Sequence, residues 1–237
     1  MNEYIEKLVE QLENPDLPQL VLNLAESMRE VWRNGNSFFL CGNGGSAGNA
    51  IHLANDFLYG INKHTGKGIK VEALSANPSV LTCLANDIGY ENIYSYQLHV
   101  KASKNDILLV LSGSGNSENV VNAIKTGNKI GMKTFAILGY TGGDCKKLAQ
   151  HPIHISVNDM QISEDLQLIV GHMRMQSAGT VAFRCGTAAT GKCLIMNPAA
   201  LGWVWQGSAN QDVVHAPAGR CGDGHWHKMT ECPEECI

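Results

Sequence analysis

Short apolar runs alternate with longer amphipathic segments along the first 177 residues. The short runs are apolar at nearly every position, which is typical of parallel strands buried on both faces. Between them, apolar residues recur every three or four positions, which predicts helices packed on a sheet. The predicted strands are 37–41, 69–74, 107–111, 134–138 and 153–157. The predicted helices are 4–12, 17–32, 49–59, 78–85, 90–100, 120–130, 145–149 and 163–176.

This alternation predicts an α/β fold with a doubly wound parallel sheet flanked by helices. We expect N-terminal helices over 1–33, a sheet domain over 34–177 and an atypical C-terminal extension over 178–237. The extension holds five of the eight cysteines and three of the four tryptophans, and its apolar residues follow no clear period. Its abrupt change of composition fits either a poorly ordered tail or a change of reading frame. Its Cys and His residues match no standard zinc spacing.

Charge and composition argue against several classes of function. The chain has 18 Lys and Arg against 22 Asp and Glu, and no run of like charge, which argues against a nucleic-acid surface or a polybasic membrane anchor. The N-terminus is charged and no segment is apolar enough to span a bilayer, so we expect a cytoplasmic protein with a small ligand. Cys41, Cys83 and Cys145 are isolated among apolar or small neighbours, which is typical of reduced packing residues.

The loop after the strand 107–111 has the residues of a phosphate cradle. Gly113 and Gly115 let the backbone approach a ligand closely. Hydroxyl groups are available, and a helix that begins near the end of the loop would direct its free N–H groups at the same point. The hydroxyls belong to Ser112, Ser114 and Ser117. An ordinary turn between strand and helix explains these residues equally well.

A second Ser/Gly loop, Gly42–Gly48, follows the first predicted strand. It loosely fits the Gly-x-Gly-x-x-Ala fingerprint of a Rossmann dinucleotide site, which makes a dehydrogenase a competing interpretation. That interpretation requires an acidic residue at the end of the next strand, whereas Glu72 lies inside it. Two such loops at the carboxyl edge of one sheet suit a phosphorylated sugar better, with one loop on the phosphate and the other on hydroxyls.

Two predicted helices each carry an imidazole and a carboxylate. His52 and Asp56 are four positions apart and therefore share a helix face, and Glu164 and His172 are eight positions apart, slightly more than two turns. Together these side chains would bind a divalent metal or supply a general acid and base. Each residue alone is explained as well by packing or by a solvated helix surface.

Five motifs in order carry a family resemblance. They are CGNGGSAGNAIHLANDF, LTCLANDIGYENIYS, LSGSGNSENVVNAIK, LGYTGGDCKKLA and SEDLQLIVGH. With them, residues 1–176 resemble the sugar isomerase (SIS) domain family, and within it the phosphoheptose isomerases. The resemblance implies a homotetramer with shared sites and an aldose–ketose isomerase that acts on a sugar phosphate, sedoheptulose 7-phosphate, through an enediol. The alternatives are a non-catalytic sugar-phosphate-binding regulator of the same family and, third, the Rossmann dehydrogenase.

The resemblance also implies roles for single residues. The substrate pocket comprises Asn43, Gly44, Gly45 and Ser46, with Asp87 on sugar hydroxyls and Ser112, Ser114 and Ser117 on the phosphate. The implied zinc ligands are His52, Asp56, Glu164 and His172, and the implied catalytic residues are Asp56 and His172. Two positions depart from the heptose enzymes, which carry Glu, both ligand and base, at position 56 and a metal-binding Gln at position 164. The shorter Asp56 would displace the base by more than about an ångström, a shift that matters for proton transfer.

Overall fold

A computed structural model describes residues 2–182, 219–220 and 226–227. The chain divides into two units, Met1–Gly179 and Thr180–Ile237. In the second unit, β6 (Gly219–Arg220) pairs antiparallel with β7 (Trp226–His227), and the other expectations for the tail lie outside the described residues. No helix in the described part of the chain has the length and apolarity needed to cross a membrane.

The first unit is built on a parallel sheet, as the sequence predicts. Among the described residues, five strands join in the order β2-β1-β3-β4-β5. They are β1 (Ser37–Gly42), β2 (Lys70–Ala73), β3 (Ile107–Ser112), β4 (Lys133–Leu138) and β5 (His151–His154). Every residue of β3 is buried, because helices cover both faces of this central strand. The pairing of Gly42 with Leu111 brings the carboxyl ends of β1 and β3 side by side.

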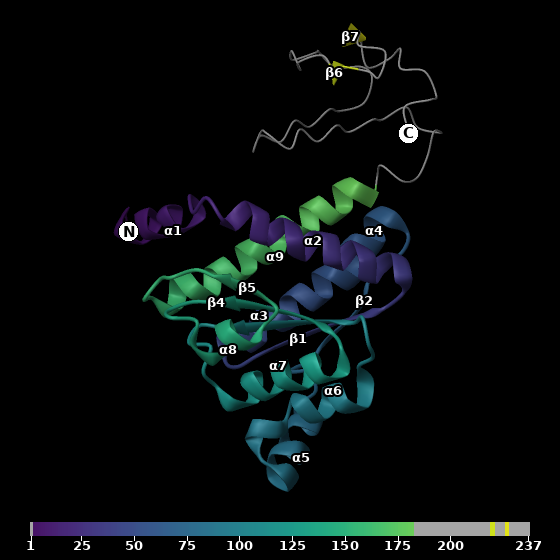
Figure 1. Ribbon diagram of the computed structural model, residues 1–237, viewed down its shortest axis with the longest axis vertical. Coiled ribbons are helices and arrows are strands. Elements are labelled where there is room, and N and C mark those ends of the chain that lie inside the picture. The colour runs from purple at the N-terminus through teal and green to yellow at the C-terminus, as the bar shows by residue number, and fades with distance from the viewer. Residues whose placement is uncertain (1, 183–218, 221–225, 228–237) are drawn as a thin grey trace. The chain divides into compact units, whose positions relative to one another are not determined.

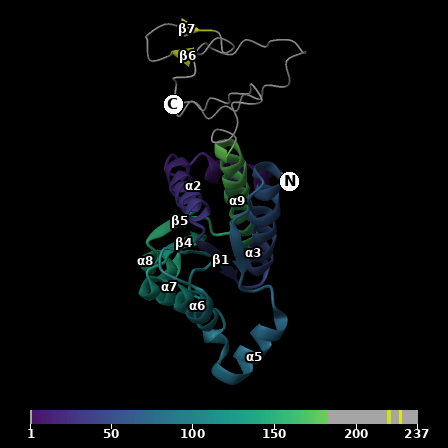
Figure 2. The same cartoon turned by 90° about the vertical axis from the view of Figure 1, so that its right-hand side faces the viewer.

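Helices lie on both faces of the sheet, which confirms the doubly wound fold (Figures 1 and 2). Helices α2, α3 and α9 cover one face, and α6, α7 and α8 cover the other. The helical segments that precede β3 are α1 (Asn2–Leu12), α2 (Leu17–Asn34), α3 (Gly45–Asn55), the π-helical η1 (Asp56–Gly60), α4 (Ile61–Thr65), α5 (Pro78–Ile88), the 3₁₀ turn η2 (Tyr90–Asn92) and α6 (Ser95–Lys101). Those that follow it are α7 (Glu118–Ile130), α8 (Gly143–Leu148) and α9 (Met160–Ala182).

The two cores follow from the alternation of side chains along the strands. Phe38 and Leu40 of β1 pack with α2, α3 and α9, whereas Phe39 and Cys41 pack with α6, α7 and α8. Cys41 and Cys145 are buried free thiols, and burial raises the pKa of Cys145 to about 12. The expectation that Cys83 packs in the same way is wrong, because this thiol is exposed on α5.

Several predicted boundaries differ from the structure, and two of the differences have a clear physical reason. The strand expected at 153–157 begins earlier, at His151, and includes Pro152. Proline has no N–H to donate, but β5 tolerates it because β5 is an edge strand and one of its two sides has no neighbouring strand to pair with. The helix expected at 49–59 begins at Gly45 and continues through η1 into α4. Its glycine-rich first turn has the composition of a loop, so the spacing of apolar residues does not reveal where the helix begins.

Candidate functional site

Both Ser/Gly loops lie where the strand order reverses. In a sheet of order 2-1-3-4-5, the connections from β1 and β3 run to opposite faces, and ligands bind beyond the carboxyl ends at that point. Residues 43–44 follow β1, and residues 113–117 follow β3. The structure therefore brings the two predicted loops together beyond the carboxyl ends of β1 and β3, where a ligand site is expected.

The hydroxyl groups of the second loop keep their protons available. Ser112 Oγ accepts a hydrogen bond from the Gly115 N–H at 3.0 Å, and Ser114 Oγ accepts one from the Asn116 N–H at 3.3 Å. Ser117 is the N-cap residue of α7, makes no side-chain cap and has no other hydroxyl partner among the described residues. Each of these three hydroxyls thus keeps a proton that it can donate, and the loop leads into the first turn of α7.

The loop after β4 holds this second Ser/Gly loop in place. Gly115 has φ +68°, and a Cβ there would lie 2.1 Å from the carbonyl oxygen of Gly142, so no side chain fits. The Gly139 N–H donates to Gly113 O at 3.0 Å, and the Cys145 N–H donates to Gly115 O at 3.0 Å. These contacts fix the conformation of the second Ser/Gly loop.

The first loop leads directly into α3 and is tied to α9. Gly44, the N-cap of α3, has φ +54°. Ser46 is buried, and its Oγ accepts from Gln167 Nε2 at 3.0 Å, while Gln167 Oε1 accepts from Asn49 Nδ2 at 3.0 Å. Gln167 was not predicted as part of this site, and its only sequence signal is a polar residue within an apolar stretch of α9. It fixes the hydroxyl that the resemblance places in the substrate pocket.

Three of the four predicted metal ligands converge. Asp56 Oδ2 lies 3.3 Å from His52 Nε2 and 3.3 Å from His172 Nε2, and the two imidazole nitrogens are 3.1 Å apart. The two rings meet nearly edge to face, at 80°. Asp56 is the first residue of η1, so it still follows His52 by one regular helical turn, while His172 reaches the pair from α9.

This cluster fits a zinc ion. Ligand atoms of a tetrahedral site with bonds of about 2.0–2.1 Å lie about 3.3 Å from one another. The three donor atoms of His52, Asp56 and His172 are separated by 3.1–3.3 Å and combine imidazole nitrogen with carboxylate oxygen, as zinc prefers. Three protein ligands and an open fourth position are typical of a catalytic zinc site.

Glu164 and Asp87 lie apart from this cluster. The Glu164 carboxylate occupies the space above Gly45, since a Cβ on Gly45 would be 2.4 Å from Glu164 Oε2. A negative charge at this point faces the N-terminus of α3, where the helix dipole stabilises it. Asp87, on α5, accepts hydrogen bonds from Asn86 and Cys83 of the same helix, and none of its hydrogen bonds within the described residues reaches a loop.

Comparison with known proteins identifies the family. The family model described as SIS domain matches residues 2–139, more than half of the chain. The chain belongs to the SIS domain family. Among curated relatives of this SIS domain, the phosphoheptose isomerase of Aliarcobacter butzleri is 36% identical over 171 residues, covering 72% of this chain and 87% of the relative. That of Aneurinibacillus thermoaerophilus is 30% identical over 181 residues, covering 73% and 91%. Among solved structures, the phosphoheptose isomerase of Neisseria gonorrhoeae superposes with a TM-score of 0.68 at 26% identity, covering 75% and 93%.

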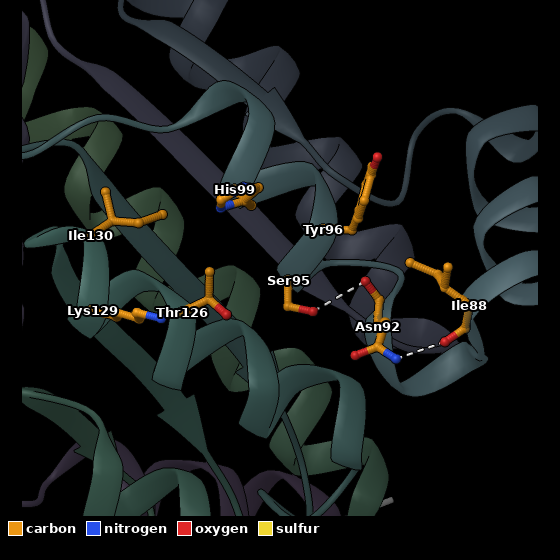
Figure 3. Close-up of a pocket in the computed structure, with 8 residues that line it drawn as sticks. All are labelled: Ile88, Asn92, Ser95, Tyr96, His99, Thr126, Lys129 and Ile130. Carbon is orange, nitrogen blue, oxygen red and sulfur yellow. Dashed lines mark hydrogen bonds between the residues drawn. The ribbon is translucent and has the colours of Figure 1, made fainter.

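A separate groove of about 420 Å³ lies on the outer side of α6 and α7 (Figure 3). Ser95, within it, donates to Asn92 O, and Asn92 Nδ2 donates to Ile88 O. Its other lining residues are Tyr96, His99, Thr126, Lys129 and Ile130. None of the predicted site residues lines this groove, so it is not part of the candidate site of the SIS domain.

Proposed function

We propose that this SIS domain protein isomerises sedoheptulose 7-phosphate to an aldoheptose 7-phosphate through an enediol. The convergence of His52, Asp56 and His172 carries the proposal, because a protein that only binds sugar phosphates needs the loops but not this cluster. The phosphoheptose isomerases that cover most of this chain support the same assignment. The second loop would bind the phosphate through Ser112, Ser114 and Ser117.

The reaction moves two protons. A base removes the proton from the carbon beside the carbonyl, the electrons form the C=C bond of the enediol, and a proton is then delivered to the neighbouring carbon. A second group carries the proton between the two oxygens. Asp56 and His172, whose Oδ2 and Nε2 atoms lie 3.3 Å apart, would divide these two tasks. Asn43, Gly44, Gly45 and Ser46, with Asp87, would hold the sugar hydroxyls.

We propose zinc as the bound metal, held by His52, Asp56 and His172. Held there, a zinc ion would supply positive charge to stabilise the enediolate oxygen. Glu164, where relatives of the heptose type carry Gln, would join only by turning away from Gly45. His52→Ala should lower the zinc content of the purified protein, and excess zinc should restore part of it; metal analysis with zinc content equal to the wild type would contradict the assignment.

We also propose that the protein assembles as a homotetramer. Exposed apolar side chains on α1 and around the metal cluster support this, because they lack cover in the single chain. They include Ile5 and Val9 on α1, Ile51 on α3 and Leu58 on η1. Analytical ultracentrifugation should give a tetramer for the wild type and smaller species for Ile51→Glu; a monomeric wild type would contradict this proposal.

Proton NMR in deuterated water tests the function directly. With sedoheptulose 7-phosphate, the wild type should produce aldose signals and exchange the hydrogen on the reacting carbon for deuterium. His172→Ala is the matched control and should do neither. If the wild type gives neither product nor exchange with zinc supplied, the isomerase proposal fails.

The competing functions have less support. A sugar-phosphate-binding regulator would bind the ketose phosphate without exchange, which the same NMR experiment reports. A Rossmann dehydrogenase would need a free carboxylate at the end of β2, but Glu72 lies inside β2 and forms an ion pair with Lys101 at 2.5 Å. If the protein does not bind NAD(P), the dehydrogenase interpretation is excluded.

A further inference from the structure

Asn119 and Tyr90, which no prediction included, join Asn43 of the first loop in a hydrogen-bond network. Asn43 Nδ2 donates to Asn119 Oδ1 at 2.8 Å, and Asn119 Nδ2 donates back to Asn43 Oδ1 at 2.8 Å. The Tyr90 hydroxyl donates to the same Asn43 oxygen at 3.1 Å. Asn119 is only 1% exposed, so its amide depends on these partners, because a buried polar group without one is costly.

The backbone sets the polarity of the network. The Val120 N–H donates to Asn119 Oδ1 at 2.9 Å, and a peptide N–H can only donate. This contact places the amide oxygen of Asn119 and leaves its NH₂ group toward Asn43. Asn43 must then present its own oxygen to that NH₂ group. A tyrosine hydroxyl in contact with the same oxygen has to donate its proton.

Tyr90 is the member of the network that solvent can reach. Its neighbour Tyr94 is buried, donates its single hydroxyl proton to Gly42 O and has a raised pKa because of burial. Tyr90 is 57% exposed. Once its proton is directed at Asn43, its phenolic oxygen retains lone pairs that can only accept a hydrogen bond.

We propose that Tyr90 accepts a hydrogen bond from a hydroxyl group of the bound sugar, and that Asn119 positions Asn43 and Tyr90 for this contact. The inference rests on the proposed function, which places Asn43 in the substrate pocket. An acceptor cannot stabilise a phosphate dianion, whereas a sugar hydroxyl can donate to it. Tyr90 therefore recognises the polyol part of the ligand, and the serine loop recognises the phosphate.

Calorimetric titration of sedoheptulose 7-phosphate against single tyrosine variants tests the contact. Tyr90→Phe should raise the Kd roughly 3- to 10-fold, the effect of one neutral hydrogen bond, and should leave the Kd for inorganic phosphate unchanged. Tyr96→Phe is the matched control, since Tyr96 is 49% exposed and its hydroxyl makes no hydrogen bond within residues 2–182. An unchanged Kd for the sugar phosphate in Tyr90→Phe overturns the proposal.

Asn119→Asp tests the positioning role without removing volume. The carboxylate can still accept from the Val120 N–H and from Asn43 Nδ2, but it offers no NH₂ group. Asn43 Oδ1 therefore loses its donor and faces a carboxylate oxygen, so it no longer holds a fixed position as the acceptor for Tyr90. The Kd should rise as much as in Tyr90→Phe, and the double variant should show no further rise. Multiplication of the two effects in the double variant would overturn the role of Asn119. Thermal melting verifies folding, and Tyr90→Phe decides the case if Asn119→Asp is unfolded.

Failure of this inference is distinguishable from failure of the proposed function. Binding that depends on Tyr90 without any isomerised product contradicts the isomerase and supports the inference. If turnover occurs and neither the turnover rate nor the Kd changes in Tyr90→Phe, the result contradicts the inference and supports the isomerase. A wild type that does not bind the sugar phosphate at all contradicts both.

Discussion

Removal of the Ser117 hydroxyl should weaken phosphate binding without weakening the fold. Ser117 is the N-cap of α7, but its side chain makes no capping hydrogen bond, and its hydroxyl has no partner in the described chain. Ser117→Ala therefore breaks no internal interaction. The hydroxyl can act only on a ligand or on water.

The size of the effect follows from the charge of the ligand. A hydrogen bond to a charged group contributes about 1.5–3 kcal/mol, and 1.4 kcal/mol is tenfold in affinity. The Kd of Ser117→Ala for the sugar phosphate should therefore rise about 10- to 150-fold. Its free energy of unfolding should stay within about 0.5 kcal/mol of the wild type, as for a substitution that removes no native contact.

Ser112→Ala is the informative comparison, because Ser112 is 8% exposed and its Oγ accepts from the Gly115 N–H. This substitution leaves a buried N–H without its acceptor, so it should cost about 1–3 kcal/mol of stability as well as affinity. Calorimetry measures the Kd values, and urea denaturation measures the unfolding free energies. If Ser117→Ala binds the sugar phosphate as the wild type does, the segment is an ordinary turn and not a phosphate site.

Three further outcomes are expected. His172→Ala should abolish turnover and leave the calorimetric affinity for phosphate intact; residual turnover at the wild-type rate would exclude His172 from proton transfer. Gly45→Ala should displace the Glu164 carboxylate, because the new Cβ would lie 2.4 Å from it, but should lower the melting temperature little, since the end of this side chain can move; a large drop would contradict this expectation. The hydrogen bond to Asp165 raises the pKa of Tyr4 from 10.0 to about 12, so the folded state holds this proton more tightly. Tyr4→Phe should therefore lower stability below pH 10, with the difference vanishing as pH rises toward 12; a difference that persists above pH 12 would refute this linkage.

Glu164 shows where helical spacing ceases to predict a site. His52 and Asp56 are four residues apart, about 6 Å along the axis, and both reach one point. Glu164 and His172 are eight residues apart, which is about 12 Å along α9 and about 80° around it. Two residues that helical periodicity places on roughly the same face can therefore lie too far apart along the helix to reach one site. The carboxylate lies at the N-terminus of α3 instead, which no property of α9 alone predicts.

The fold itself was predictable because its central strands are apolar at almost every position. The run 107–111 has no polar residue, and β3 is buried along its whole length. The network around Asn43 was not predictable in this way. Asn119 lies among Val120, Val121 and other apolar residues of α7, and its partner is 76 residues away. Such pairing depends on how α7 and the first loop meet in space, which no local pattern records.

The position of His172 on the last helix of the sheet domain has a consequence for biosynthesis. The two Ser/Gly loops and the strands before them are complete by residue 117, but the contact between His52 and His172 spans 120 residues. Closure of so long a segment is slow relative to local structure, and it must await synthesis of α9. A nascent chain that has left the ribosome only as far as β5 would therefore already present both Ser/Gly loops, while the cluster of His52, Asp56 and His172 would form only when α9 docks beside α3.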